Sequence, residues 1–414
     1  MKNQRVTLSR ALLLWIGAGG AVLPNIGCES SESGQGHGSS FSRVDSAGIT
    51  ILTTPGESAQ AFLGWTIDSV PDVVIGAGAD EGDQLYRVQG IKGFEDGSFL
   101  VVDGGSRQLR FFDAQGGPTH RVGRKGEGPG EFEDPILVPL VGLDSLLVWD
   151  RYLQRFQYFS PDGQSNHTLR LVDRWPAGGR PPHGAVGSRM LLDEWEIDWF
   201  VPASQQTHGP KDTGVNFLWY DPVSQSQVHL ASHRVTRDFH FTRSGRPPVR
   251  DQIPFTVFPT GTVAQDGGLI TDGITYQIKE YSLAGEVRRI LRLDLPGRPV
   301  TDAMIRDWME SEMTSRNGGA LLQEVLGSMP MPYTLPAFES LLMDDLGFVW
   351  AKIYDWDPVQ PQRWVVFDPD GAALGSVEIP LGLEVKWIGP EAVLGVWKDE
   401  FGVEHVHRHG LRRE

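Results

Sequence analysis

Eight arginine and aromatic residues are the clearest candidates for chemistry in this sequence, and their types suit ligand binding. Arginine, tyrosine and tryptophan contribute most of the binding energy at protein interfaces. Tyrosine and tryptophan rings also provide flat faces on which carbohydrate or peptide groups can stack. The candidates are Arg107, Tyr152, Arg155, Trp195, Trp199, Tyr276, Tyr354 and Trp356.

Three aspartates, Asp103, Asp150 and Asp272, end equivalent apolar runs of the sequence. Together they could surround an opening and hold a divalent cation through oxygen ligands. The alternative is that each carboxylate caps its own turn by accepting backbone N–H groups. Repetition favours capping, because a structural role recurs in each repeat whereas a binding site is usually unique. No cofactor is therefore predicted, and a structural or catalytic divalent cation stays an alternative.

Three histidines near the C-terminus are spaced two residues apart. In a β-strand, His405, His407 and His409 would project from one face of the sheet. Two imidazoles on one face could bind zinc or copper. The simpler interpretation is a polar, solvent-facing side of the last strand.

The sequence contains no recognised catalytic motif. A Gly-x-Ser-x-Gly nucleophile elbow and a Gly-x-x-x-x-Gly-Lys-Ser/Thr phosphate loop are both absent. The segment 126–130 is rich in glycine, but Pro129 lacks an N–H donor and Glu127 would repel phosphate, which indicates a turn. A thiol nucleophile is excluded because the single cysteine, Cys28, lies in a targeting segment.

An internal repeat supplies the elements that position these residues. Six apolar runs recur, each followed by a corner that in most copies begins with an aromatic residue and ends in glycine. The corners are FDAQG at 112–116, FSPDG at 159–163, YDPVS at 220–224, YSLAG at 281–285, FDPDG at 367–371 and the degenerate VHRHG at 406–410. Repeated β-units of this size favour a propeller, and an ordinary β-sandwich is the alternative.

One stretch resembles a known repeat. LVVDGGSRQLRFFDAQGGPTHRVGRKGEGPGEF, residues 100–132, is similar to an NHL-type repeat. The whole chain resembles the bacterial lipoproteins described only as six-bladed β-propeller proteins. The resemblance is strongest over residues 84–163, weaker but continuous to the C-terminus, and interrupted by insertions in repeats three and five. It implies a fold without implying one activity.

The sequence thus predicts an all-β fold, a six-bladed β-propeller of four-stranded antiparallel blades over residues 43–414. Chain reversals in such blades alternate between two ends of the ring. One end, the short-turn face, receives tight turns such as 113–116 and 369–371. The other end, the loop face, receives the long insertions 194–214, 233–254, 296–336 and 354–362. Long loops on a rigid scaffold carry function more often than short ones.

The insertion at 296–336, between blades four and five, is predicted to be helical. Thr301 is a plausible N-cap. One side at helical spacing is apolar and consists of Met304, Ile305, Trp308, Met309 and Met313. We expect this side to pack onto the propeller, and the alternative is that it binds an apolar partner.

The N-terminus is predicted to be a lipoprotein-type signal peptide, residues 1–28, that ends at the acceptor Cys28. Basic residues precede an apolar stretch from Ala11 to Leu23. The segment before Cys28 resembles a lipobox, although Asn25 stands where leucine is usual. A simple secretory signal or an uncleaved anchor is the alternative. Residues 29–42 form a Ser/Gly-rich tether.

The last repeat has room for only three strands. An alternating run at 48–52 lies outside the first repeat, so we predict that this N-terminal strand completes the last blade and closes the ring. Closure would remove an exposed sheet edge.

The net charge of −16 argues against binding of nucleic acid through phosphate neutralisation. We therefore predict a lipid-anchored, extracytoplasmic protein of the cell envelope, either periplasmic or at the outer membrane. Its predicted role is to bind a peptide, glycan or envelope protein on the loop face. The alternative function is a cation-dependent hydrolase or lyase, lactonase-like or lyase-like, with its site at the channel mouth. The absence of a recognised nucleophile favours binding.

Overall fold

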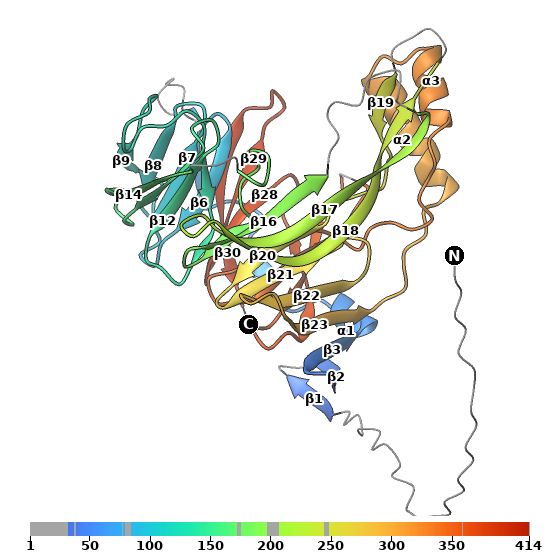
Figure 1. The fold of residues 1–414 in the computed structure, drawn as a ribbon, viewed down its shortest axis with the longest axis horizontal. Helices are drawn as coiled ribbons and strands as arrows, with labels where there is room; N and C mark the ends of the chain where they lie inside the picture. Colours follow the sequence, from blue (N-terminus) through green and yellow to red (C-terminus); the bar gives the residue numbers. More distant parts are fainter. Residues whose placement is uncertain are drawn as a thin grey trace, which may run out of the picture.

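The computed structural model describes most of the chain, and it confirms the all-β class. The described residues are 32–36, 39–76, 78, 84–171, 175–196, 207–243, 248–357 and 359–413. Their strands form six sheets of four to seven strands, most of them antiparallel (Figure 1). The arrangement is that of a propeller-like protein. The signal peptide, Cys28 and Trp199 lie outside the described residues.

The first sheet shows the plan that the others follow. Its strands β6 (Val88–Gly93), β7 (Phe99–Asp103), β8 (Gln108–Phe112) and β9 (Pro118–Val122) pair in chain order. The second strand is buried at all five positions, whereas the fourth is mostly exposed. This gradient explains why the second strand reads as a continuous apolar run, since neighbouring sheets cover both of its faces.

The other sheets repeat this order with additions at their edges. The second contains β10 (Pro135–Val138), β12 (Leu146–Asp150), β13 (Arg155–Phe159) and β14 (Ser165–Arg170). The third contains β11 (Leu140–Val141), β15 (Gly184–Val186), β16 (Arg189–Glu196), β17 (Gly209–Asp221), β18 (Ser226–Phe241) and β19 (Val249–Gln252). The fourth contains β20 (Thr260–Ala264), β21 (Gly267–Thr271), β22 (Gln277–Ser282) and β23 (Val287–Asp294). The last two contain β24 (Phe338–Met343), β25 (Val349–Ile353), β26 (Gln362–Phe367), β27 (Ala373–Ile379), β28 (Glu384–Ile388), β29 (Ala392–Lys398) and β30 (Glu404–Arg412).

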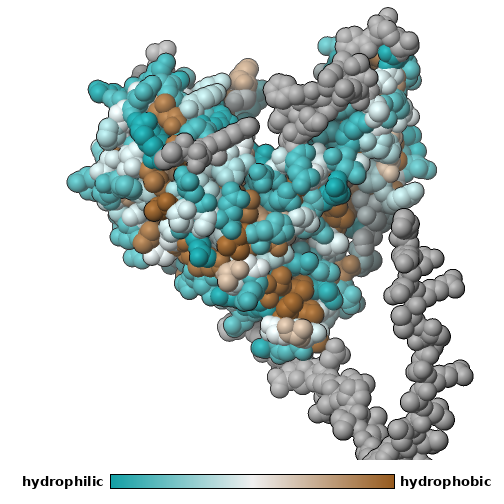
Figure 2. All heavy atoms as spheres, in the orientation of Figure 1, coloured by the Kyte–Doolittle hydropathy of each residue, from teal (hydrophilic) through white to brown (hydrophobic). Residues whose placement is uncertain are grey.

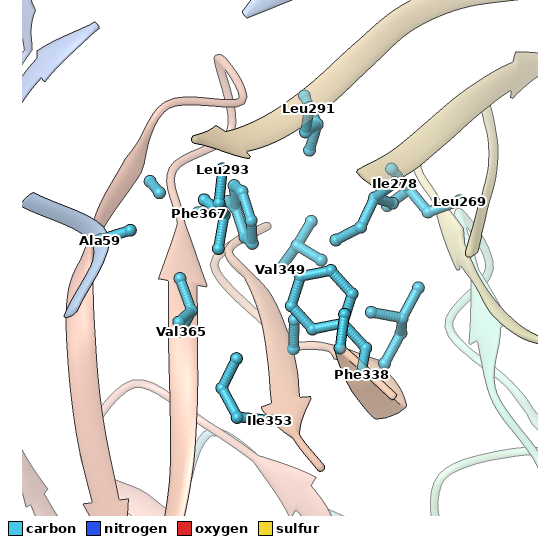
Figure 3. Close-up of a cluster of buried hydrophobic side chains, with 14 of the residues drawn as sticks. Ala59, Leu269, Ile278, Leu291, Leu293, Phe338, Val349, Ile353, Val365 and Phe367 are labelled. Atoms are coloured by element: carbon cyan, nitrogen blue, oxygen red, sulfur yellow. The ribbon is translucent and has the colours of Figure 1, made fainter. Parts of the chain in front are cut away.

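Apolar side chains fill the spaces between successive sheets. Figure 3 shows Leu269 and Ile278 of the fourth sheet beside Phe338 and Val349 of the next. A comparable cluster joins the last sheet to the first. Most of the burial that stabilises the fold therefore lies between sheets, whereas the viewed surface is mainly hydrophilic (Figure 2).

The repeated corner glycines are required by this packing. Gly116, Gly163, Gly285 and Gly371 have φ between 83° and 97°, a conformation that favours glycine. A Cβ on Gly163 would lie 2.9 Å from Phe111 of the preceding sheet. The aromatic-x-x-x-Gly pattern thus records the close approach of each turn to its neighbour.

The prediction that the run at 48–52 closes the last blade is wrong. This run belongs to β3 (Ile49–Pro55), which pairs in parallel with β23 at the outer edge of the fourth sheet. The strands β2 (Ser39–Ser46) and β1 (Glu32–Gly36) extend the same edge. Its alternating pattern suits any half-buried edge strand, so the pattern alone could not identify the partner.

Closure of the last sheet comes instead from a later part of the N-terminal segment. Two short strands, β4 (Thr66–Ile67) and β5 (Val73–Ile75), pair antiparallel with β30. A Cβ on Gly116 would lie 2.6 Å from Val73 and 3.0 Å from Ile75, so β5 occupies the place that the preceding outer strand has elsewhere.

An arm projects from the ring (Figure 1). The long strands β17 and β18 include much of the insertions predicted as loops, and they extend outward with β19 at the edge. The helices α2 (Asp302–Ser315) and α3 (Ala320–Gly327) pack against this extension. A third helix, α1 (Gly56–Gln60), follows β3.

The helical insertion begins as predicted, and its apolar side packs partly on the arm. The Thr301 side chain accepts a hydrogen bond from the Met304 N–H at 3.3 Å, which confirms the N-cap. Trp308, with its neighbouring methionines, packs against Phe239 and Phe241 of the arm. Met304 and Ile305 pack instead with Leu335 and Tyr354, which flank β24 and β25 of the fifth sheet. The apolar side of the helix is thus used inside the molecule, against both the arm and the ring.

Candidate functional site

The loop face gathers residues from adjacent sheets around the starts of the innermost strands. The first strand of each sheet begins at this end, and the second strand finishes there, because the two are antiparallel. Arg87 precedes β6, Asp134 precedes β10 and Arg151 follows β12. Residues distant in sequence are therefore brought side by side.

Asp103 positions the segment that carries Arg87. The buried carboxylate accepts the N–H groups of Gly105 at 3.0 Å and Tyr86 at 3.4 Å, and the Ser106 hydroxyl at 2.8 Å. In the same turn, the N–H groups of Gly104 and Gly105 donate to the carbonyls of Arg87 and Tyr86 at 3.0 and 2.8 Å. The carboxylate holds both its own turn and the adjacent loop.

Asp150 has the same role in the second sheet. Its buried carboxylate accepts the N–H groups of Glu133 at 2.9 Å and of Asp134 and Leu153 at 3.2 Å. Asp272 accepts the N–H groups of Ile274 and Thr275 at 2.8 Å. All three predicted aspartates have the geometry of turn caps.

Asp134 is the centre of the candidate site. Its side chain is fully buried, and its two carboxylate oxygens separately contact Nη2 of Arg87 and Nη2 of Arg151. Burial of an unpaired carboxylate is costly, and the two guanidinium groups compensate that cost. The side chains of Arg87 and Arg151 are themselves 39% and 40% exposed.

A strongly exposed tyrosine adjoins each of these arginines in the chain. Tyr86 is 69% exposed and Tyr152 is 70% exposed. The Arg151 guanidinium carbon lies 5.5 Å from the centre of the Tyr152 ring, within the range of a cation–π contact. Tyr86, Arg87, Arg151 and Tyr152, arranged around buried Asp134, are named here the arginine–tyrosine site.

A second polar centre lies next to it. Asp193, 6% exposed, contacts the Arg180 guanidinium at 3.3 Å and His183 Nε2 at 3.5 Å, and accepts the indole N–H of Trp195. Burial alone would raise the pKa of Asp193. The hydrogen bond and charge of His183, the charge of Arg180 and the hydrogen bond from Trp195 together hold this pKa below its ordinary value. Asp193 thus remains a carboxylate that fixes three side chains.

Trp195 is held between other residues rather than presented freely. The Arg180 guanidinium carbon lies 4.1 Å from its ring centre, and the Phe258 ring lies at 4.1 Å. The loop that carries Arg180 also touches the first centre, because a Cβ on Gly179 would lie 3.9 Å from Arg151. The two centres therefore form one continuous arc on the loop face.

Two of the predicted binding residues, Arg155 and Arg107, make structural contacts within the protein. Arg155 is fully buried and donates to the carbonyls of Gly128 and Glu131 at 3.1 and 2.7 Å. It organises the glycine-rich turn and is not accessible to a ligand, so its assignment as a binding residue is wrong. Arg107, which is part exposed, donates to the Glu133 carbonyl at 3.1 Å and joins the first two sheets.

Three predicted aromatics lie away from the arginine–tyrosine site. Tyr276 packs edge-on against Phe338, with ring centres 5.7 Å apart. Tyr354 and Trp356 pack with Phe255 near the base of the arm. Burial, followed by the charge of Glu339, raises the pKa of Tyr354 to about 12. The structure thus separates these three from Tyr152 instead of bringing all the candidates together.

The three histidines form a row of neighbouring rings on β30. Successive ring centres lie 6.4 and 5.9 Å apart, and His407 stacks on Trp397 at 5.3 Å. His405 contacts Asp399 at 3.5 Å, and His409 is buried with Nδ1 2.7 Å from the Asp68 carbonyl. The row is therefore packed against the closing segment and is not a solvent-facing side. No group of three His, Cys, Asp or Glu suited to a metal occurs among the described residues.

Acidification is expected to destabilise the protein through this row. Burial, and then the charges of His409 and His405, lower the pKa of His407 to about 4, whereas an unfolded histidine titrates near about 6.5. The unfolded chain takes up the proton first, so stability should fall as pH decreases between these values. The denaturant concentration at which half of the protein is unfolded should decrease from pH 7 to pH 5. This decrease should be smaller in His407→Gln than in the wild type. An equal loss in both proteins would contradict this.

A cavity at the opposite, short-turn face offers an alternative location. It has a volume of about 420 Å³ and is lined by turns that include Asp266, Glu280, Arg289 and Asp345. Its charged groups are already paired, as in the contact of Glu280 with Arg289 and of Asp345 with Lys92 at 2.9 Å. The arginine–tyrosine site differs in having guanidinium groups that outnumber their carboxylate.

Sequence reasoning missed Tyr86, Arg87, Asp134 and Arg151. The usable signal was positional, because each lies just before an innermost strand or just after a second strand. Arg87 and Asp134 are 47 residues apart in the sequence, so no local pattern indicates that they are in contact.

Comparisons with known proteins give similarities of structure only. No protein-family model and no curated protein matches the chain. A DUF4221 family member from Bacteroides vulgatus matches at 10% identity and TM-score 0.47, over 84% of this chain and 98% of its own. A Bacteroides fragilis protein named as exported matches at 10% identity and 0.43, over 88% and 99%. Virginiamycin B lyase from Staphylococcus aureus matches at 9% identity and 0.37, over 84% and 100%.

The described helices are short, and α2, with 14 residues, is longer than α1 and α3. None of them is both long and apolar enough to cross a bilayer.

Proposed function

We propose that this protein is a membrane-tethered, extracytoplasmic six-bladed β-propeller that binds a ligand on its loop face. The ligand class comprises envelope proteins, peptides and glycans. The observation that carries this proposal is the arginine–tyrosine site, where two part-exposed arginines share one buried carboxylate beside two exposed tyrosines. These residue types dominate binding energy at interfaces.

Six blades agree with the six sheets and with the six recurrences of the corner sequence. Each sheet contains a core of three or four strands that pair in chain order. Such a scaffold is rigid, and rigid scaffolds suit the placement of binding residues at strand ends.

The tether is proposed from the N-terminal sequence, in which Cys28 follows an apolar segment. Replacing Cys28 with alanine is expected to release the protein from membranes or block its processing, because the thiol would no longer accept a lipid. The measurement is metabolic labelling with a fatty-acid analogue followed by membrane fractionation. Labelling of Cys28→Ala as strong as that of the wild type would exclude the lipid anchor.

Loss of the exposed tyrosines is expected to weaken binding. The double variant Tyr86→Ala/Tyr152→Ala should lose about 2 kcal/mol or more of binding free energy, as truncation of interface aromatics commonly does. Stability should change by about 0.5 kcal/mol or less per site, since both side chains are mostly exposed. The measurement is recovery of ligands from the cell envelope by immobilised wild-type and variant protein.

The matched control replaces exposed apolar residues on the short-turn face. Leu143 and Val223 are 50% and 72% exposed there, and the double variant Leu143→Ala/Val223→Ala should recover ligands as the wild type does. Equal recovery by all three proteins would refute the loop-face assignment, and a loss confined to the control would move the function to the other face.

A further inference from the structure

We propose that Arg87 and Arg151 bind the carboxylate of an acidic sugar, a uronic acid residue of a glycan, while Tyr86 and Tyr152 provide stacking surfaces for its ring. This inference rests on the proposed binding function and specifies its ligand.

The arginines are held in place with part of their hydrogen-bonding capacity unused. Each directs only Nη2 to Asp134. Among the described residues, no protein acceptor is found for Nε or Nη1 of either arginine. Both side chains are part exposed. Nη2 lies beside Nε on one edge of the guanidinium and beside Nη1 on the other, so with its second N–H each arginine can still form a planar two-donor fork, which matches a carboxylate.

The local charge favours a monoanion. Two guanidinium groups surround the carboxylate of Asp134. The neighbouring carboxylates have cations of their own, because Asp103 pairs with Arg110 at 3.4 Å and Asp150 stands opposite Arg155. The site therefore has one positive charge in excess. A carboxylate would neutralise that excess, whereas a phosphate dianion would reverse it. Nearby Arg107 contributes no further excess, because its Nε lies 3.7 Å from Glu133. The whole chain carries −16, so attraction of an acidic ligand must come from this site.

The tyrosines favour a sugar over a peptide. Peptide side chains are usually anchored in pockets that exclude water, whereas Tyr86 and Tyr152 are 69% and 70% exposed. An exposed ring offers a flat platform on which a pyranose can stack. The contact of Arg151 with Tyr152 holds the platform beside the carboxylate-binding donors.

The test is titration calorimetry of the full-length protein in detergent with an oligogalacturonate of five residues. Saturable binding is expected. The methyl-esterified oligomer lacks the charge, and its affinity should be lower by at least about tenfold. Arg87→Gln and Arg151→Gln should each weaken binding about tenfold or more. Arg124→Gln should not, because Arg124 is 79% exposed on the same face and pairs only with Glu131 among the described residues.

Arg87→Lys keeps a positive charge near Asp134 but removes the planar fork. It should retain the wild-type melting temperature and still lose most of the affinity, which separates ligand binding from a structural role. Unchanged affinity in Arg87→Lys and Arg151→Lys would overturn the proposal.

The remaining outcomes separate this inference from the general function. Absent or charge-independent binding of the oligogalacturonate would overturn the uronate assignment, even if the Tyr86→Ala/Tyr152→Ala variant still lost ligands from the envelope. Tighter binding of an acidic peptide, with the same dependence on Arg87, would replace the glycan with a peptide. If the wild type and the Tyr86→Ala/Tyr152→Ala variant recover the same ligands from the envelope in equal amounts, the loop-face function itself is refuted.

Discussion

The Arg413→Ala variant is expected to lose about 3–5 kcal/mol of unfolding free energy, although the residue is next to the last in the chain. Arg413 contacts the Asp344 carboxylate at 2.8 Å, and the two side chains are only 12% and 0% exposed. Removing one partner leaves the other as an uncompensated buried charge, which is strongly destabilising.

Aromatic contacts add to the effect. The Arg413 guanidinium carbon lies 4.6 Å from the Trp65 ring centre and 5.3 Å from that of Phe348. These residues come from the closing segment and from the fifth sheet, so Arg413 joins parts that are more than 60 residues apart in sequence. The C-terminus thus secures the junction between the last two sheets.

Chemical denaturation of the wild type, Arg413→Ala and Arg412→Ala measures this contribution. Arg412 is the matched control, because its side chain is 62% exposed and pairs with Asp68 at the surface. Exposed ion pairs contribute about 1 kcal/mol or less. Similar losses in the two variants would show that Arg413 contributes only as a surface charge.

The strands and turns could be predicted because their signals are local. An apolar run such as 99–103 and a corner such as 112–116 are complete within a few residues. The same is true of the Thr301 cap and of Asp103, whose turn contacts are two and three residues away. Repetition of these signals was sufficient for the fold class.

The site could not be predicted because its residues act through long-range contacts. Asp134 looked like an ordinary loop carboxylate until Arg87 and Arg151 were placed around it. Arg155 lies at a strand end, where a surface arginine is expected, yet its Nη1 and Nη2 groups donate to carbonyls of a loop 24 to 28 residues earlier. Burial of charged groups depends on neighbouring sheets, and side-chain type alone does not reveal it.

The insertions were predicted as loops for a related reason. Residues 209–221 and 226–241 pair with each other as β17 and β18 well beyond the length of the other strands. Their polar, interrupted composition resembles a loop, because one part of the pair leaves the ring and packs against α2 and α3 instead of against a neighbouring sheet. Partial covering of this kind produces no continuous apolar run.

Substitution of isoleucine by alanine on two N-terminal strands is expected to identify the one that closes the ring. Ile75 of β5 is 8% exposed and belongs to the core between the last and first sheets. Ile75→Ala should cost about 2–5 kcal/mol, the usual range for this truncation in a core. Ile51 of β3 is only half-buried, at an added edge of the fourth sheet, so Ile51→Ala should cost about 1 kcal/mol. Both values come from denaturant titration monitored by tryptophan fluorescence. A larger loss for Ile51→Ala than for Ile75→Ala would contradict the assignment of closure to β5, because truncation in the closing core should cost more than truncation at an added edge.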